Sequence, residues 1–307
     1  MSNLKTQILI QALARRLTRA RVLKSEDAWE KLYRELQDAM TRAWDDNMRN
    51  AAAAALDHLR ELDQSHFTEE DAQLIHETLE NRVGVVAMIA ALYGPLLNLT
   101  EAFYRTGIQE VVATRGVDVS FRHLDQNAIN ITQRANLYWV GNSWNTYTDK
   151  LLRQSLTDYF KQGYSRQQLI ERLANDFAGL TERGHHYWNL LADHIATRTR
   201  EIGRIDAYTS AQIKYIQIRA HLDARTSDVC RKMHGKIIPV ERLVAQRDAY
   251  LKAASERDME TAKQVWHMWK ESDDLSQLDV PGEKLPTNTV MPPYHFRCRT
   301  ISVVYFR

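Results

Sequence analysis

Apolar residues recur every three or four positions along most of the first two thirds of the chain, a spacing that predicts amphipathic helices. Between residues 25 and 48 the large apolar side chains fall on one helical face: Trp29, Leu32, Tyr33, Leu36, Met40 and Trp44. The same spacing predicts helices over 128–162 and from about 186 to 213. Ser165 and Gln168 have the spacing of a capping box, which predicts a short helix that ends near Phe177.

After residue 213 the pattern changes to strict alternation, which predicts strands at 215–222, 236–240 and 300–306 in a small antiparallel sheet. A charged helical segment and a polar loop separate the second strand from the third. We therefore expect a mainly α chain with a short antiparallel sheet near its C-terminus. The predicted domains are a helical region at 1–180 and a small α+β domain at 181–307 with a helical insertion at 241–290.

The longest apolar run, 83–99, is interrupted by Gly94 and Pro95, which are expected to end or kink a helix. A membrane span needs about 20 apolar residues. This run therefore predicts a buried core helix and no transmembrane segment. With 307 residues, of which 44% are hydrophobic, the chain is long enough for one large or two medium domains, and a net charge of +2 indicates no global preference for polyanions.

Charge is nevertheless concentrated at the N-terminus. Residues 1–24 contain no acidic residue, and their basic residues include Arg15, Arg16, Arg19 and Arg21. This basic amphipathic segment is either the solvated face of a packed helix or a contact for nucleic acid, a membrane surface or a partner protein. Trp266 and Trp269 lie three residues apart on a charged segment. They either form a second partner-binding face or pack onto the protein's own sheet.

The two cysteines of the chain each lie close to a histidine. Cys230 precedes His234 by four residues, and His295 precedes Cys298 by three, so that the four side chains would complete a tetrahedral zinc site. Ser227 or Thr226 can cap a short helical turn around Cys230, and Gly235 can end it. The residues alone leave three alternatives open: a structural zinc, a disulfide, or plain packing of two buried thiols. No other cofactor is indicated.

A second set of residues favours a structural clamp. Asp223 follows a predicted strand, and Arg225 and Arg299 could bind its carboxylate with two parallel hydrogen bonds that join distant segments. A catalytic role for these residues would require a pocket that the sequence does not indicate.

The segments 221–236 and 292–299 together resemble the signature of the head-morphogenesis, or minor capsid, family of tailed bacteriophages, the Mu F-like proteins. The matching positions are Asp223, Arg225, Thr226, Cys230, Gly235, Pro292, His295, Cys298 and Arg299. His234 is not part of the family pattern.

The resemblance implies a non-enzymatic virion protein, present in few copies near the portal vertex of the phage head and made in the host cytoplasm. It would assist head assembly and genome packaging or ejection. The implied partners are the portal protein, other capsid subunits and packaged double-stranded DNA, with no small-molecule substrate. Because related domains are fused to toxins, the alternative is a nuclease-like or transferase-like effector that uses His221, His295, Arg225 and Arg299.

Overall fold

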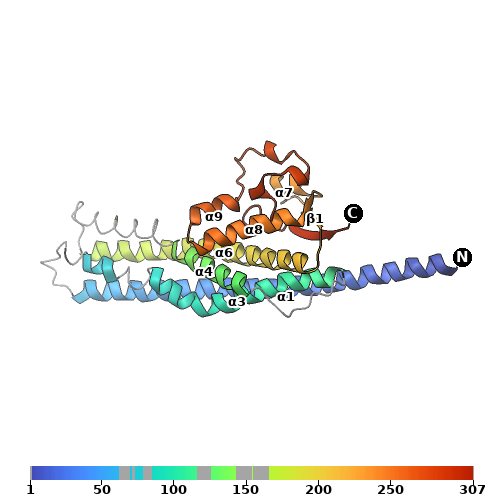
Figure 1. Ribbon diagram of the computed structural model, residues 1–307. Coiled ribbons are helices and arrows are strands. Elements are labelled where there is room, and N and C mark those ends of the chain that lie inside the picture. The colour runs from blue at the N-terminus through green and yellow to red at the C-terminus, as the bar shows by residue number, and fades with distance from the viewer. Residues whose placement is uncertain are drawn as a thin grey trace. The chain divides into compact units, whose positions relative to one another are not determined.

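The chain is mainly helical, with a small sheet in its C-terminal part (Figure 1). The computed structural model describes residues 2–61, 70, 73–78, 85–115, 126–142, 154 and 166–306. Within these ranges it does not describe the side chains of 2–27, 55, 58–59, 85, 114–115, 138, 141–142, 166–167, 169–170, 173, 177, 180 and 183. The long helices are α1 (Ser2–Glu61), α3 (Val85–Arg115), α4 (Gln126–Asn142) and α6 (Arg166–Ser210). The C-terminal elements are β1 (Tyr215–Arg219), α7 (Asp228–Met233), β2 (Ile237–Pro239), α8 (Val240–Ser255), α9 (Met259–Val265), three 3-10 turns at Ser276–Leu278, Gly282–Lys284 and Thr287–Thr289, and β3 (Ile301–Tyr305). The predicted fold class is confirmed.

The chain divides into two compact units. Unit 1 consists of residues 1–34, 98–135 and 193–307, and unit 2 of 35–97 and 136–192. Unit 1 thus contains the three strands of the sheet and all the elements that lie between them in the chain.

In unit 2 the apolar face predicted for α1 is buried. Its core residues there are spaced by four: Leu36, Met40, Trp44 and Met48. The Trp44 ring packs against Trp188 of α6, and its Nε1 donates a hydrogen bond to a backbone carbonyl of that helix. A Cβ at Gly184 would lie 2.0 Å from Trp44 Nε1, so only glycine permits this approach.

In unit 1 the backbones of α3 and α6 touch at two glycines. A Cβ on Gly107 would lie 2.0 Å from the carbonyl oxygen of Arg200, and one on Gly203 would lie 2.1 Å from that of Tyr104. Two helices can approach this closely only where neither presents a side chain. The pair of glycines therefore sets the α3–α6 spacing.

A buried ion-pair network adjoins this crossing. Glu110 of α3 accepts hydrogen bonds from Arg200 and from Arg204 of α6, with Nε–Oε2 distances of 2.8 and 2.9 Å. Glu201 pairs with Arg204 and also accepts from the Ser302 hydroxyl of β3. Burial alone would raise the pKa of Glu110, but the charges of Arg204 and Arg200 hold that pKa below its usual value. The network links α3, α6 and the sheet.

The sheet has the strand order β2-β1-β3 and is antiparallel throughout. Ile216 and Ile218 of β1 are buried, as alternation predicts, and lie opposite Val304 and Ser302 of β3. The Tyr208 hydroxyl of α6 donates to the Ser302 carbonyl at 2.9 Å. The sheet is thereby fastened to α6 within unit 1.

Two of the predicted helix ends differ from the structure. Of the two alternatives expected at Gly94 and Pro95, an end or a kink of the helix, the end does not occur, because α3 continues through Pro95. Gly94 and Ala91, which lies one turn before Pro95, are exposed. The two helices predicted between 165 and 213 form one helix, α6, since packing at Gly184 outweighs the weak helix propensity of glycine. For the helix predicted over 128–162, most of 143–162 lies outside the described residues.

One described helix, Val86–Ala113, is long and apolar enough to cross a membrane, judged by length and composition only. The core helix of a soluble protein passes the same test, and 33% of the apolar window is buried here. The C-terminal part of this helix carries Glu110, which pairs with Arg200 and Arg204 of α6.

Candidate metal centre

Cys230 lies on α7, a short helix whose ends follow the sequence prediction. The Ser227 hydroxyl oxygen accepts from the Cys230 N–H and caps the first turn. Gly235, with a φ of 81°, ends it, and the Gly235 N–H donates to the Ile218 carbonyl of β1 at 2.8 Å. Both ends of α7 are thus fixed, and the Cys230 side chain points inward.

His295 and Cys298 lie on the loop that leads into β3. Between them, Arg297 adopts a φ of 58°, a left-handed conformation that is uncommon for a residue with a side chain. Asp193 of α6 holds this turn, because its carboxylate accepts the Arg297 N–H at 2.6 Å. Burial raises the pKa of Asp193 to about 6. The turn directs His295 and Cys298 toward Cys230.

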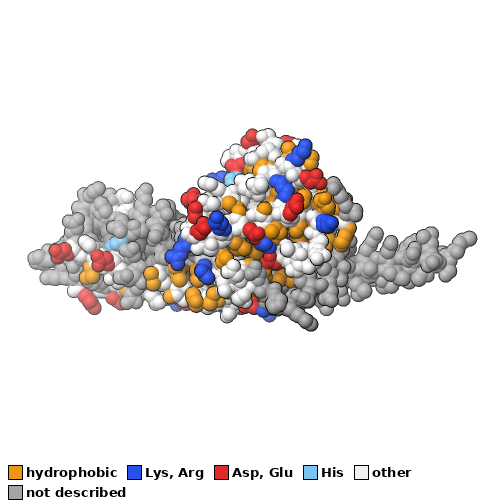
Figure 2. Space-filling view, viewed as in Figure 1, with side chains coloured by type: hydrophobic (Ala, Val, Ile, Leu, Met, Phe, Trp, Pro, Cys, Tyr) orange, Lys and Arg blue, Asp and Glu red, His pale blue; other side chains and the backbone are white. Residues whose placement is uncertain are grey.

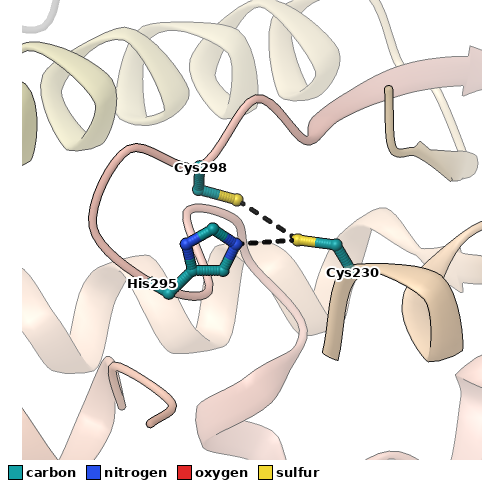
Figure 3. Close-up of side chains that lie close together, drawn as sticks. All are labelled: Cys230, His295 and Cys298. Atoms are coloured by element: carbon teal, nitrogen blue, oxygen red, sulfur yellow. Dashed lines mark hydrogen bonds between the residues drawn. The ribbon is translucent and has the colours of Figure 1, made fainter. Parts of the chain in front are cut away.

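The three side chains point toward one another (Figure 3). Cys230 Sγ lies 3.2 Å from His295 Nε2 and 3.6 Å from Cys298 Sγ, and the three candidate ligand atoms all lie within 4.8 Å of one another. Both cysteines are buried free thiols, and His295 is half-buried. Two sulfurs and an imidazole nitrogen form a group that is compatible with metal binding.

Electrostatics makes the two sulfurs unequal. A hydrogen bond from Cys230 lowers the pKa of Cys298 well below its ordinary value, and His295 lowers it further. The same hydrogen bond, together with burial, raises the pKa of Cys230. Burial disfavours a charged His295, but its contact with the Cys298 sulfur outweighs this effect, so the pKa of His295 is raised. Cys298 is therefore the sulfur that loses its proton first.

His234, the fourth residue of the predicted zinc set, does not join the group. It is the C-cap of α7, with a non-helical φ of −56° and ψ of 131°, so the helical four-residue spacing to Cys230 does not apply. Its Nδ1 instead accepts the Ala220 N–H at 3.1 Å. The four-ligand arrangement is therefore wrong for His234.

The predicted clamp lies on the same two segments. Arg299 binds both carboxylate oxygens of Asp223, at 2.7 and 2.8 Å. These bonds lower the pKa of Asp223. Thr226 shapes the turn, because its hydroxyl oxygen accepts the Asp223 N–H and its hydroxyl donates to the His221 carbonyl. The predicted role of Arg225 in the clamp differs from the structure. The backbone N–H of Arg225, and not its guanidinium, donates to the Asp223 carboxylate at 2.9 Å, and the side chain is exposed.

The four residues of the enzyme alternative have different environments. The guanidinium of Arg299 is engaged by Asp223, and Arg225 is exposed. His221 is 66% exposed and lies 3.7 Å from Asp223. His295 alone belongs to the sulfur group.

The proposed role of Trp266 and Trp269 in partner binding is wrong, because both indoles are buried within unit 1. Trp266 packs edge-on against Tyr250 and beneath the guanidinium of Arg198, 4.7 Å from the ring centre. The backbone N–H of Trp269 donates to the Tyr294 carbonyl at 2.7 Å. The two tryptophans are therefore part of the hydrophobic core, where the helical insertion packs against the loop before His295.

The basic side chains Arg15, Arg16, Arg19 and Arg21 lie outside the described side chains. On the face drawn in Figure 2, the described acidic and basic side chains are interspersed with apolar ones. The hypothesis of a DNA contact thus rests on the sequence of residues 1–24.

Sequence reasoning missed Asp193 and the Glu110 network. Asp193 lies among apolar residues of α6, and Glu110 lies on the same buried face of α3 as Phe103 and Gly107. A single acidic residue on a buried helical face is the signal that could have found both, because such a carboxylate needs a buried partner.

No protein-family model, curated protein or solved structure matches the chain.

Proposed function

We propose that this protein is a non-enzymatic minor head protein of a tailed phage, which acts near the portal vertex in head assembly and in genome packaging or ejection. Its C-terminal module supplies a rigid fold, and its N-terminal helices dock on the portal and other capsid subunits. We also propose that the protein is located in the virion.

The observation that carries the proposal is the meeting of the two halves of the signature. Asp223 and Arg299 are 76 residues apart and form a two-bond ion pair; Cys230 and Cys298 are 68 apart and lie 3.6 Å from each other. A chance similarity of two short segments gives no reason for contact between them. Bringing such distant segments together carries a loop-closure cost, so the contacts support a closed structural module.

The environment of the signature residues supports assembly over catalysis. The guanidinium of Arg299 donates hydrogen bonds to both carboxylate oxygens of Asp223, and Cys230 and Cys298 are buried. These side chains hold the module together, as a protein that must keep its shape within a large assembly requires.

Detection in particles tests the proposal. An antibody against the chain should find it in purified virions of the phage that encodes it, in far fewer copies than the major shell protein. Deletion of its gene should yield heads that fail to package or deliver DNA. Absence from virions, together with an unchanged yield of infectious particles after deletion, would overturn the proposal.

The N-terminal segment supplies a separate test of DNA binding. Reversal of Arg15, Arg16 and Arg19 to Glu should weaken binding to duplex DNA at low salt, and should reduce the salt dependence by about one unit of slope for each phosphate that is no longer neutralised. The matched control reverses three exposed arginines further along α1, namely Arg34, Arg42 and Arg49. Equal binding of both variants and the unaltered protein would remove the DNA-binding hypothesis and leave the head-protein proposal to the particle test.

A further inference from the structure

We propose that Cys230, His295 and Cys298 bind one zinc ion, with the fourth coordination position left to a solvent molecule. The inference rests on the geometry and chemistry of the three side chains, and it does not depend on the proposed function.

The spacing of the donor atoms suits a shared ion. Zinc bonds of about 2.3 Å to sulfur and about 2.05 Å to nitrogen, at tetrahedral angles, place two sulfurs about 3.8 Å apart and a sulfur and a nitrogen about 3.6 Å apart. The structure has 3.6 Å between Cys230 Sγ and Cys298 Sγ, and 3.2 Å between Cys230 Sγ and His295 Nε2. A disulfide would instead require about 2.05 Å between the sulfurs.

The orientation of the imidazole is that of a metal ligand. His295 Nδ1 lies 2.7 Å from the Phe296 carbonyl oxygen. A carbonyl can only accept a hydrogen bond, so Nδ1 carries the proton and the lone pair of the neutral ring is on Nε2, the atom that faces the sulfurs. Histidines that bind metals usually donate their other ring N–H to such an oxygen, which fixes the tautomer.

The surroundings hold the three donors in place before any ion binds. The Ser227 cap fixes the first turn of α7 at Cys230, and the Asp193 carboxylate fixes the left-handed turn between His295 and Cys298. Two thiolates and one imidazole favour zinc over calcium or magnesium, which prefer oxygen ligands. Three protein ligands leave one tetrahedral position, and half-buried His295 lies on the side that solvent can reach.

Metal analysis of the full chain, purified under reducing conditions, tests the inference. We expect one zinc per chain, and both thiols should react with a thiol reagent far more slowly with zinc than after chelation. Cobalt substituted for zinc should give the intense visible bands of a tetrahedral site and a thiolate-to-cobalt charge-transfer band.

Variants locate the ion. Loss of a residue that hydrogen-bonds a metal ligand typically lowers metal affinity by ~10–100-fold. His295→Gln removes a ligand itself, so it should weaken zinc binding by more than this. The matched control is His221→Gln, which alters an exposed histidine and should leave zinc binding unchanged. Because His295 is half-exposed, its variant is expected to fold, which can be checked by circular dichroism. Cys298→Ser leaves Cys230 as the one sulfur ligand, so it should weaken cobalt binding and reduce the charge-transfer band to the intensity of a single thiolate.

Three results would each overturn the inference. The first is a metal-free protein whose two thiols react equally fast with and without added zinc. The second is a pair of thiols that stays unreactive after chelation, once the reductant has been removed, and reacts only when reductant is added again, which would show a disulfide. The third is stoichiometric zinc that survives His295→Gln and Cys298→Ser alike, which would place the ion elsewhere.

Discussion

Replacement of Glu110 by Ala should destabilise unit 1 strongly. The carboxylate is 8% exposed and forms hydrogen bonds with both Arg200 and Arg204, whose side chains are 13% and 5% exposed. Glu201 faces Arg204 at a longer 3.4 Å and also binds Ser302, so it cannot compensate both cations. Removal of one partner from a buried pair leaves an uncompensated charge and costs about 3–5 kcal/mol.

That cost is a large share of the stability of a typical domain, which is about 5–15 kcal/mol. It can be measured by urea unfolding, followed by circular dichroism and by hydrogen exchange of the β3 amides. With a urea dependence of about 3 kcal/mol per molar, the midpoint should fall by about 1 M or more. Glu110→Gln should lose most of the same stability, because its amide N–H groups would face the arginine donors.

The matched control is Glu101→Gln on the same helix and in the same unit. Glu101 pairs with Arg105 at the surface, where both side chains are at least 40% exposed. Exposed pairs of this kind contribute about 0.3–0.5 kcal/mol. If Glu110→Ala cost no more than Glu101→Gln, the idea that this network holds α3 to α6 would be refuted.

Two further predictions concern the backbone and pH. Gly107→Ala should destabilise by about 1–3 kcal/mol in thermal unfolding, because its Cβ would meet the Arg200 carbonyl, whereas Gly94→Ala, with open space around it, should change stability by at most about 1 kcal/mol. Equal effects would contradict the close approach of α3 and α6. Burial raises the pKa of Asp193 from 3.8 to about 6, because the folded state favours the neutral carboxyl. The neutral carboxyl therefore contributes folding stability that is fully present below pH 3.8 and is lost as the pH rises through 6. Asp193→Asn, which can still accept the backbone N–H of Arg297, should remove about 2 kcal/mol of this pH-dependent change in unfolding free energy between pH 4 and 7. An identical pH profile in both proteins would show that Asp193 is not the group responsible.

The fold class and the strands were predictable from sequence, because the signals that specify them are local. Alternation over a few residues marks β1 and β3, and four-residue spacing marks the buried face of α1. The cap at Ser227 and the positive φ at Gly235 are equally local, since each depends on the chemistry of one residue beside a short helix.

The candidate site was only partly predictable. Three of the four proposed ligands lie together, but His234 turns away because the helix ends at the residue before it. The buried positions of Trp266 and Trp269 likewise depend on what covers them. A periodic pattern shows which residues share a face, but it does not show which partner that face meets.

By itself, then, the sequence indicates which segments become helix or strand and which side chains could act as metal ligands. Only the tertiary structure decides that Asp193 of α6 holds the turn at Arg297, and that Glu110 of α3 pairs with two arginines of α6. The physical reason is that secondary structure arises from interactions between near neighbours in the chain. A buried carboxylate, in contrast, is compensated by whichever distant donor the folded core brings to it.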